Sequence, residues 1–67
     1  MSFRVEIERA DGDVEWYKFR GEIREWRYPE QADKFAEEMW LNYGDTGNYA
    51  RFSVVEDDGE TYSDWEC

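Results

Sequence analysis

Apolar and polar residues alternate at the start of the chain. Over residues 2–9, Phe3, Val5 and Ile7 fall on one face and charged residues on the other. A period of two is typical of a β-strand with one buried face. The Asp11-Gly12 pair that follows favours a tight turn, because glycine accepts the positive φ that such turns require. The pattern therefore predicts a strand that leads into a hairpin.

The return strand is predicted over residues 13–20, in one of two registers. A two-residue turn would place Val14, Trp16 and Lys18 behind the apolar face of the first strand. An odd-length loop would instead place Tyr17 and Phe19 there, since a slip of one residue exchanges the two faces. We favour Tyr17 and Phe19 inward, because that register leaves Lys18 in solvent.

Residues 21–28 show no clear period. They fit either a connecting loop or an edge extension of the sheet, and we expect Ile23 and Trp26 to help cover the core.

A single amphipathic helix is predicted over residues 29–43. Its apolar positions recur at the spacing of one buried stripe: Ala32, Phe35, Ala36, Met39, Trp40 and Tyr43. Pro29 fits the first helical position, where its missing N–H costs nothing, and Glu30 follows near the favourable end of the helix dipole. Gly44 stands where a left-handed C-cap is expected.

A second hairpin is predicted after the polar loop over residues 45–48. Residues 49–56 alternate, Asp58-Gly59 turns, and residues 60–66 return. A two-residue turn pairs Val55 with Tyr62 and Phe52 with Trp65, and places these residues on the core face: Ala50, Phe52, Val54 and Trp65. The sum is an α+β fold of order ββαββ, a single domain over residues 1–67 with two Asp-Gly hairpins in one antiparallel sheet and the helix across one face.

The charge of the chain is large and unevenly distributed. Eighteen acidic and eight basic residues give a net charge of −10 over 67 residues. Residues 1–28 hold six basic and seven acidic residues, whereas residues 29–67 hold two and eleven. Direct binding to nucleic acid is disfavoured, because phosphates are bound through Lys and Arg. A basic partner would instead be attracted to the C-terminal half.

Catalytic and metal-binding patterns are weak. The chain has no histidine, and its one cysteine, Cys67, has no organising neighbour. The triplet Asp45-Thr46-Gly47 occurs in aspartic proteases, but here it follows a helix and not an apolar strand. The acidic clusters around Asp11 and Asp58 do not match an EF-hand loop, and hairpin turns explain them better. We therefore expect a protein that is not an enzyme and holds no metal or cofactor.

The acids of the C-terminal half suggest a binding surface. Helical neighbours lie about 5–6 Å apart and alternate strand residues about 6.6 Å apart, spacings at which carboxylates can stand in for a row of phosphates. Leu41 lies among the helical acids and would add an apolar contact, as would an exposed ring such as Tyr62. The predicted partner-binding residues are Glu30, Asp33, Glu37, Glu38, Leu41, Asp57, Asp58, Asp64 and Glu66.

In size, acidity, element order and its acidic helix-plus-hairpin half, the chain resembles the small anti-CRISPR proteins that bacteriophages encode, in particular those that mimic DNA. This resemblance implies an inhibitor protein that occupies the Lys- and Arg-lined channel of a nucleic-acid-binding protein, for example a CRISPR effector subunit. It carries over no individual residue, because such families are diverse in sequence.

Two other interpretations remain open at this point. The chain could be an interaction or regulatory module, for example a homodimer in which the near-neutral N-terminal hairpin meets the acidic half of a second copy. It could also be a salt-adapted acidic domain, although such adaptation should be distributed along the chain. The lone terminal cysteine and the absence of a long apolar run favour a cytoplasmic location without a membrane span, which would be the host cytoplasm for a phage protein.

Overall fold

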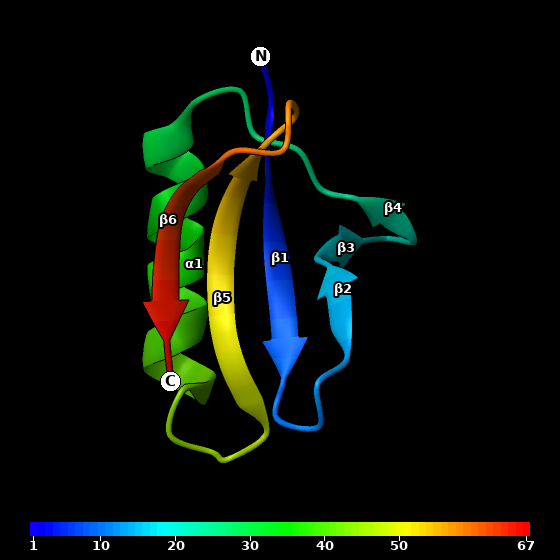
Figure 1. Cartoon of the computed structure of the whole chain (residues 1–67). Helices are drawn as coiled ribbons and strands as arrows, with labels where there is room; N and C mark the ends of the chain where they lie inside the picture. Colours follow the sequence, from blue (N-terminus) through cyan, green and yellow to red (C-terminus); the bar gives the residue numbers. More distant parts are fainter.

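The computed structural model describes all residues, 1–67, and has the predicted α+β architecture (Figure 1). A four-stranded antiparallel sheet has the order β2-β1-β5-β6, and one helix packs on one of its faces. Two further short strands form a separate hairpin at the β2 side of the molecule. The elements are β1 Phe3–Arg9, β2 Val14–Trp16, β3 Lys18–Phe19, β4 Glu22–Ile23, α1 Pro29–Tyr43, β5 Tyr49–Glu56 and β6 Thr61–Glu66.

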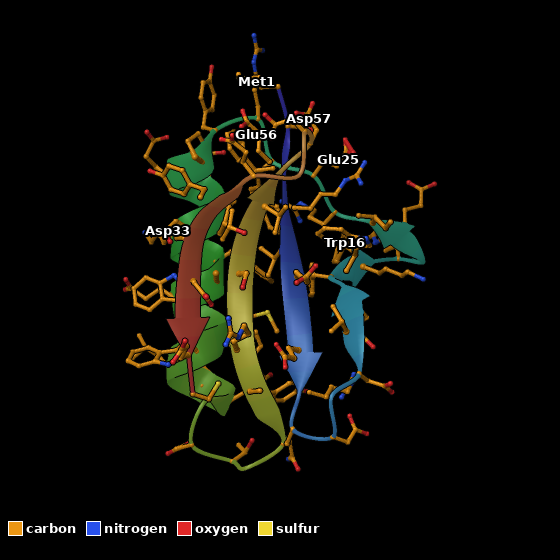
Figure 2. The ribbon with its side chains drawn as sticks, in the orientation of Figure 1. Met1, Trp16, Glu25, Asp33, Glu56 and Asp57 are labelled. Atoms are coloured by element: carbon orange, nitrogen blue, oxygen red, sulfur yellow. The ribbon has the colours of Figure 1, made fainter.

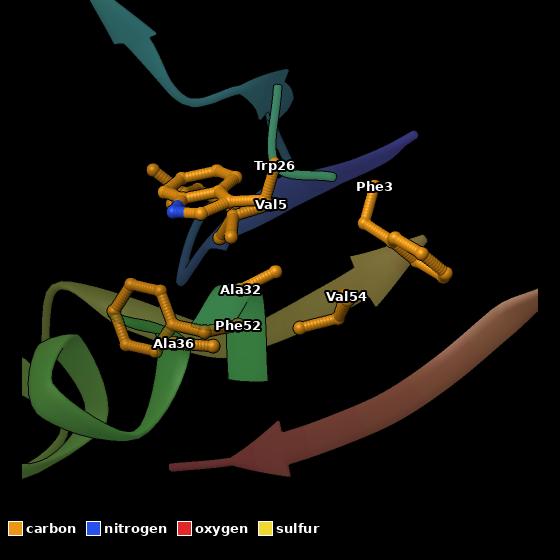
Figure 3. Close-up of a cluster of buried hydrophobic side chains, with 8 residues drawn as sticks. Phe3, Val5, Trp26, Ala32, Ala36, Phe52 and Val54 are labelled. Carbon is orange, nitrogen blue, oxygen red and sulfur yellow. The ribbon is translucent and has the colours of Figure 1, made fainter. Parts of the chain in front are cut away.

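The core lies between the helix and the two central strands, β1 and β5 (Figure 3). Ala32 and Ala36 are fully buried, and their small side chains let the helix approach the sheet closely. The predicted inward residues of β1 are all buried, as are Phe52 and Val54 of β5. Eight side chains form this cluster: Phe3, Val5, Ile7, Trp26, Ala32, Ala36, Phe52 and Val54.

The first hairpin has the odd-length loop that was favoured. Ala10, Asp11 and Gly12 connect Arg9 to Asp13, whose backbone carbonyl accepts the Arg9 N–H at 2.7 Å. Glycine is needed at position 12, where φ is +98°. The prediction for Tyr17 is confirmed, because its N–H donates to Val5 O at 2.8 Å and its ring packs against the core.

The prediction for Phe19 is wrong, because the edge strand is interrupted. In an uninterrupted ladder Phe19 would stand opposite Phe3. That place belongs to Trp26, which exchanges two backbone hydrogen bonds with Phe3, each of 2.8 Å. Residues 18–25 form a projecting hairpin instead, and Phe19 is 48% exposed. Trp26 covers the core as expected, whereas Ile23 lies on the projecting hairpin and is exposed.

The second hairpin reaches the predicted core register by a different route. Its turn has a three-residue loop, since Glu56 N–H donates to Glu60 O at 2.7 Å, and Val55 therefore pairs with Thr61 and not with Tyr62. A register shift between Val54 and Val55 then restores the pairing of Phe52 with Trp65. The extra residue, Tyr62, lies at a β-bulge and packs edge-on against Phe3.

The helix has the predicted bounds but ends differently. Pro29 occupies its first turn as expected. Gly44 is right-handed, with φ −64°, so the predicted left-handed C-cap is wrong. Glycine is still required there, because a Cβ would collide with the carbonyl oxygen of Trp40, which accepts the Gly44 N–H. No helix of the structure is long and apolar enough to cross a membrane.

Candidate functional site

Asp33 faces the sheet rather than the solvent. Its Oδ1 accepts hydrogen bonds from Ser63 Oγ at 2.6 Å and from Trp65 Nε1 at 2.9 Å, both on β6 (Figure 2). About two turns further along the helix, Trp40 Nε1 donates to the backbone carbonyl of Glu66 at 2.7 Å. These contacts fix the helix along β6, so Asp33 serves the fold and its carboxylate is already engaged.

Asp64 and Glu66 lie on the sheet face opposite the helix. Their neighbours Ser63 and Trp65 point toward α1, and successive side chains of a strand point to opposite faces. Both acids surround Arg51, whose guanidinium lies 2.9 Å from Asp64 and 3.5 Å from Glu66. Arg51 Nε also lies 3.3 Å from a Glu8 carboxylate oxygen. These two acids therefore share one arginine with Glu8, and the sheet separates them from the helical acids.

The outer face of the helix keeps its acids free. Glu30, Glu37 and Glu38 are exposed and belong to no ion pair of the structure. Lys34, which could pair with Glu38 at i, i+4, forms no ion pair either. Glu30 and Glu37 are about 10.5 Å apart along the axis, the rise of seven helical residues. That span matches about three phosphate-to-phosphate steps along one DNA strand.

Leu41 continues the line of Glu30 and Glu37 and is 62% exposed. It borders a shallow hollow at the C-terminal end of the helix, together with the half-buried ring of Trp40 and the end of β6. Cys67 also lines this hollow, and partial burial raises the pKa of its thiol. Leu41 and the Trp40 ring thus form an apolar surface at the end of the line of acids that Glu30 and Glu37 define.

The β5–β6 turn forms a second acidic group at the end of the molecule where the helix begins. Figure 2 shows Glu56 and Asp57 there, near Met1, and the same end carries a hollow lined by Pro29 and Glu60. Asp58 has a local role, because its Oδ1 accepts the Glu60 N–H at 2.9 Å, as the turn interpretation requires.

Crowding of acids at this turn changes the titration of Glu56. Carboxylate oxygens of Glu56, Asp58 and Glu60 all lie within 4.8 Å of one another. Partial burial of the Glu56 carboxyl raises its pKa above the usual range, and the charges of Asp58, Asp57 and Glu60 raise it further. No basic residue forms an ion pair with any of these four acids.

The projecting hairpin carries a cationic group that the sequence analysis did not identify. Arg20 and Arg24 lie over the exposed Phe19 ring, with guanidinium carbons 5.2 and 5.7 Å from its centroid. Arg20 has φ +55°, the only non-glycine residue with a positive φ. The Arg20-Gly21 pair was the available signal, since two positive φ values in succession make a two-residue hairpin turn.

The nine residues predicted to bind a partner are thus divided among different surfaces. Glu30, Glu37, Glu38 and Leu41 share the outer face of the helix, and Asp57 and Asp58 lie at the turn near its first residue. The others are Asp33, inside the helix–β6 contact, and Asp64 and Glu66, beyond the sheet. Comparison of the chain with protein-family models, with curated proteins and with solved structures found no match in any of the three.

Proposed function

We propose that this chain is a small acidic inhibitor that binds a basic, nucleic-acid-binding protein and blocks its access to nucleic acid. Some of the phage anti-CRISPR proteins that the chain resembles act as DNA mimics, and such a protein would act in the cytoplasm of the host. The observation that carries the proposal is the outer face of the helix, where Glu30, Glu37 and Glu38 are exposed and unpaired.

Rigidity supports this assignment. A surface that replaces phosphates must hold its charges at fixed positions, since ordering flexible groups on binding costs free energy. The helix is anchored to β6 near its beginning through Asp33 and near its end through Trp40. The backbone positions of Glu37 and Glu38, which lie between these anchors, are therefore fixed in the free protein.

Leu41 supports a protein partner over a simple counter-ion. An exposed leucine at the end of the acidic line can enter an apolar pocket that phosphates would leave empty. Long-range attraction from a net charge of −10 would speed the encounter, and Leu41 would add specificity to it.

The test is a pull-down from a nuclease-treated bacterial lysate at low and high salt. We expect the wild-type chain to retain a nucleic-acid-binding protein at low salt, and DNA to displace it. The Glu37→Lys/Glu38→Lys variant should lose this protein, with retention at least about tenfold weaker, because like charges then face each other.

Asp13→Lys/Glu22→Lys is the matched control, with the same change in net charge but outside the helix. It should retain the partner, and circular dichroism should show that both variants are folded. Retention by Glu37→Lys/Glu38→Lys at the wild-type level would refute the proposal.

A further inference from the structure

Residues 18–25 add almost nothing to the core. Every residue from Lys18 to Glu25 is exposed, and the two short strands of this hairpin pair only with each other. Its links to the rest of the molecule are the hydrogen bond from Arg24 N–H to Tyr17 O, at 3.0 Å, the ion pair of Glu25 with Arg4, at 2.9 Å, and the Arg24 guanidinium carbon, 5.0 Å from the centroid of the Trp26 ring. Burial of Trp26 opposite Phe3 ends the edge strand, but it does not require a hairpin of this length before it.

The ladder would close without most of this segment. Tyr17 bonds opposite Val5, and Trp26 bonds opposite Phe3, so a single residue is needed opposite Arg4. Glu25 already places its carboxylate on Arg4. The ladder therefore needs only Glu25 between Tyr17 and Trp26, and residues 18–24 form an insertion that the ladder does not require.

The tip of the insertion is built around cations at some cost. Arg20 holds a left-handed backbone conformation, which is unfavourable for a residue with a Cβ and which Asn, Asp or Gly would adopt more readily. Its guanidinium and that of Arg24 share the ring of Phe19. Strain at an exposed, functionally unassigned residue points to a binding role.

The charges on the tip select an acidic partner. Lys18, Arg20 and Arg24 form no ion pair within the molecule, and only Glu22 opposes them on the tip. Guanidinium groups match carboxylates and phosphates equally well. Nucleic acid needs more phosphate contacts than three cations beside Glu22 can supply, however, which favours a small carboxylate-bearing surface on a protein.

We propose that the insertion binds the β5–β6 turn of a second copy of this chain, in a head-to-tail arrangement. The turn offers the complementary feature, with Asp57 and Asp58 exposed at its tip and a Glu56 whose neighbours repel its charge. Both elements are protruding turns at different places on the molecule, so each copy can use both at once (Figure 1). Such an interface is heterologous and allows rings or open chains.

Neutral variants of the two tips test this arrangement by sedimentation velocity at low salt over a concentration series. The wild-type chain should associate with rising concentration and dissociate with added salt. Arg20→Ala/Arg24→Ala and Asp57→Asn/Asp58→Asn should each weaken association roughly tenfold, the factor expected when two exposed ion pairs are lost. Asn at position 58 keeps the oxygen that accepts the Glu60 N–H.

An equimolar mixture of these two variants gives the sharpest outcome. One keeps an intact acidic turn and the other an intact cationic tip, so the mixture should form a 1:1 dimer and no larger species. Arg27→Ala/Lys34→Ala, which also removes two unpaired cations, should associate like the wild type. So should Glu37→Lys/Glu38→Lys, which separates this inference from the function proposed for the helix.

Three results would overturn the inference. They are a wild-type chain that stays monomeric over the series, wild-type association by Arg20→Ala/Arg24→Ala, and a mixture that stays monomeric. A last measurement tests whether the wild-type chain and the Arg20→Ala/Arg24→Ala variant bind a labelled single-stranded oligonucleotide. Binding that the Arg20→Ala/Arg24→Ala change abolishes would assign the tip to nucleic acid and refute the second copy.

Discussion

The two hairpins of this protein begin from nearly the same turn and end differently. In both, an aspartate side chain accepts a hydrogen bond from the backbone N–H two residues later. Asp11 Oδ1 accepts from Asp13 N–H at 3.0 Å, and Asp58 Oδ1 accepts from Glu60 N–H at 2.9 Å. Both turns also place a glycine at positive φ, +98° and +95°. Yet β6 continues for six residues, whereas β2 ends after three and gives way to an exposed insertion.

The difference lies in what each outer strand packs against. Strand β6 is held by the helix, because Ser63 and Trp65 donate to Asp33 and the Glu66 carbonyl accepts from Trp40. No helix lies along the corresponding positions after β2, and Trp26 supplies the core residue there from later in the chain. Similar turns thus start a hairpin, but tertiary contacts decide how far its outer strand extends.

The largest difference in the free energy of unfolding should be that between substitutions of Phe52 and Phe19, which the sequence pattern both predicts to face inward. Phe52→Ala removes a fully buried ring and should destabilise the fold by about 3–5 kcal/mol, close to the whole stability of a domain of this size. Phe19→Ala, on the insertion, should change stability by less than about 0.5 kcal/mol. Urea denaturation followed by circular dichroism measures both, and equal effects would contradict the division between core and insertion.

A smaller effect should follow from loosening β6. Asp33→Ala leaves Trp65 Nε1 and Ser63 Oγ without their acceptor and should cost about 1.5–3 kcal/mol. Asp33→Asn keeps an oxygen acceptor and should recover part of that loss. Glu37→Ala, an acid on the outer face of the same helix, should be nearly neutral in the same urea titration. An unchanged free energy of unfolding for Asp33→Ala would show that β6 does not depend on this contact.

The insertion itself should be dispensable for folding. Deletion of residues 18–24 joins Tyr17 to Glu25 and should leave the free energy of unfolding within about 1 kcal/mol of the wild type, since short loop changes cost little. Amide hydrogen exchange should then still show protection at Tyr17 and Trp26, whose N–H groups donate to Val5 O and Phe3 O. Loss of the folded state on deletion would mean that the insertion supports the sheet.

The smallest effect concerns the acidic turn. The pKa of Glu56 is higher in the folded state than its ordinary value, so the folded chain holds this proton more tightly than the unfolded chain does. The stabilisation that the folded state gains from protonated Glu56 is therefore fully present below the ordinary carboxyl pKa. It is lost as the pH rises through the raised pKa of Glu56 in the folded state. Glu56→Gln should remove the fall in the free energy of unfolding that ionisation of Glu56 causes as the pH rises, and should therefore stabilise the protein at neutral pH.

Denaturation midpoints between about pH 4 and pH 7 measure this change. Glu22→Gln, the same substitution on the insertion, should keep the wild-type profile. An unchanged profile for Glu56→Gln would show that repulsion at the turn does not affect folding.

The parts of the fold that follow from local periodicity could be predicted from the sequence. The inward face of β1 and the bounds of the helix come from patterns within one element. The pairing of Phe52 with Trp65 was predicted from a two-residue turn, and it holds because the bulge at Tyr62 offsets the longer loop. The insertion could not be predicted, because residues 13–20 alternate as a continuous strand would. Only competition from Trp26 for the backbone of Phe3 ends that strand, and this contact joins distant residues.

The candidate site shows the same limit. Periodicity correctly placed Glu30, Glu37 and Leu41 on the exposed side of the helix. Asp33 lies at the border of that side, and whether it meets solvent depends on the bulge that turns Ser63 and Trp65 toward it. Asp64 and Glu66 were correctly placed on one face of their strand, but only the packed sheet shows that Arg51 lies between them.

Competition for nucleic acid tests the central proposal most directly. With the protein captured in the pull-down, its affinity for a labelled DNA is measured by fluorescence anisotropy as this chain is added. The wild-type chain should raise the apparent Kd for DNA in proportion to its concentration, and Glu37→Lys/Glu38→Lys should leave that Kd unchanged. An unchanged Kd in a saturating excess of the wild-type chain, with all three molecules in one complex, would contradict inhibition by occupation of the nucleic-acid site.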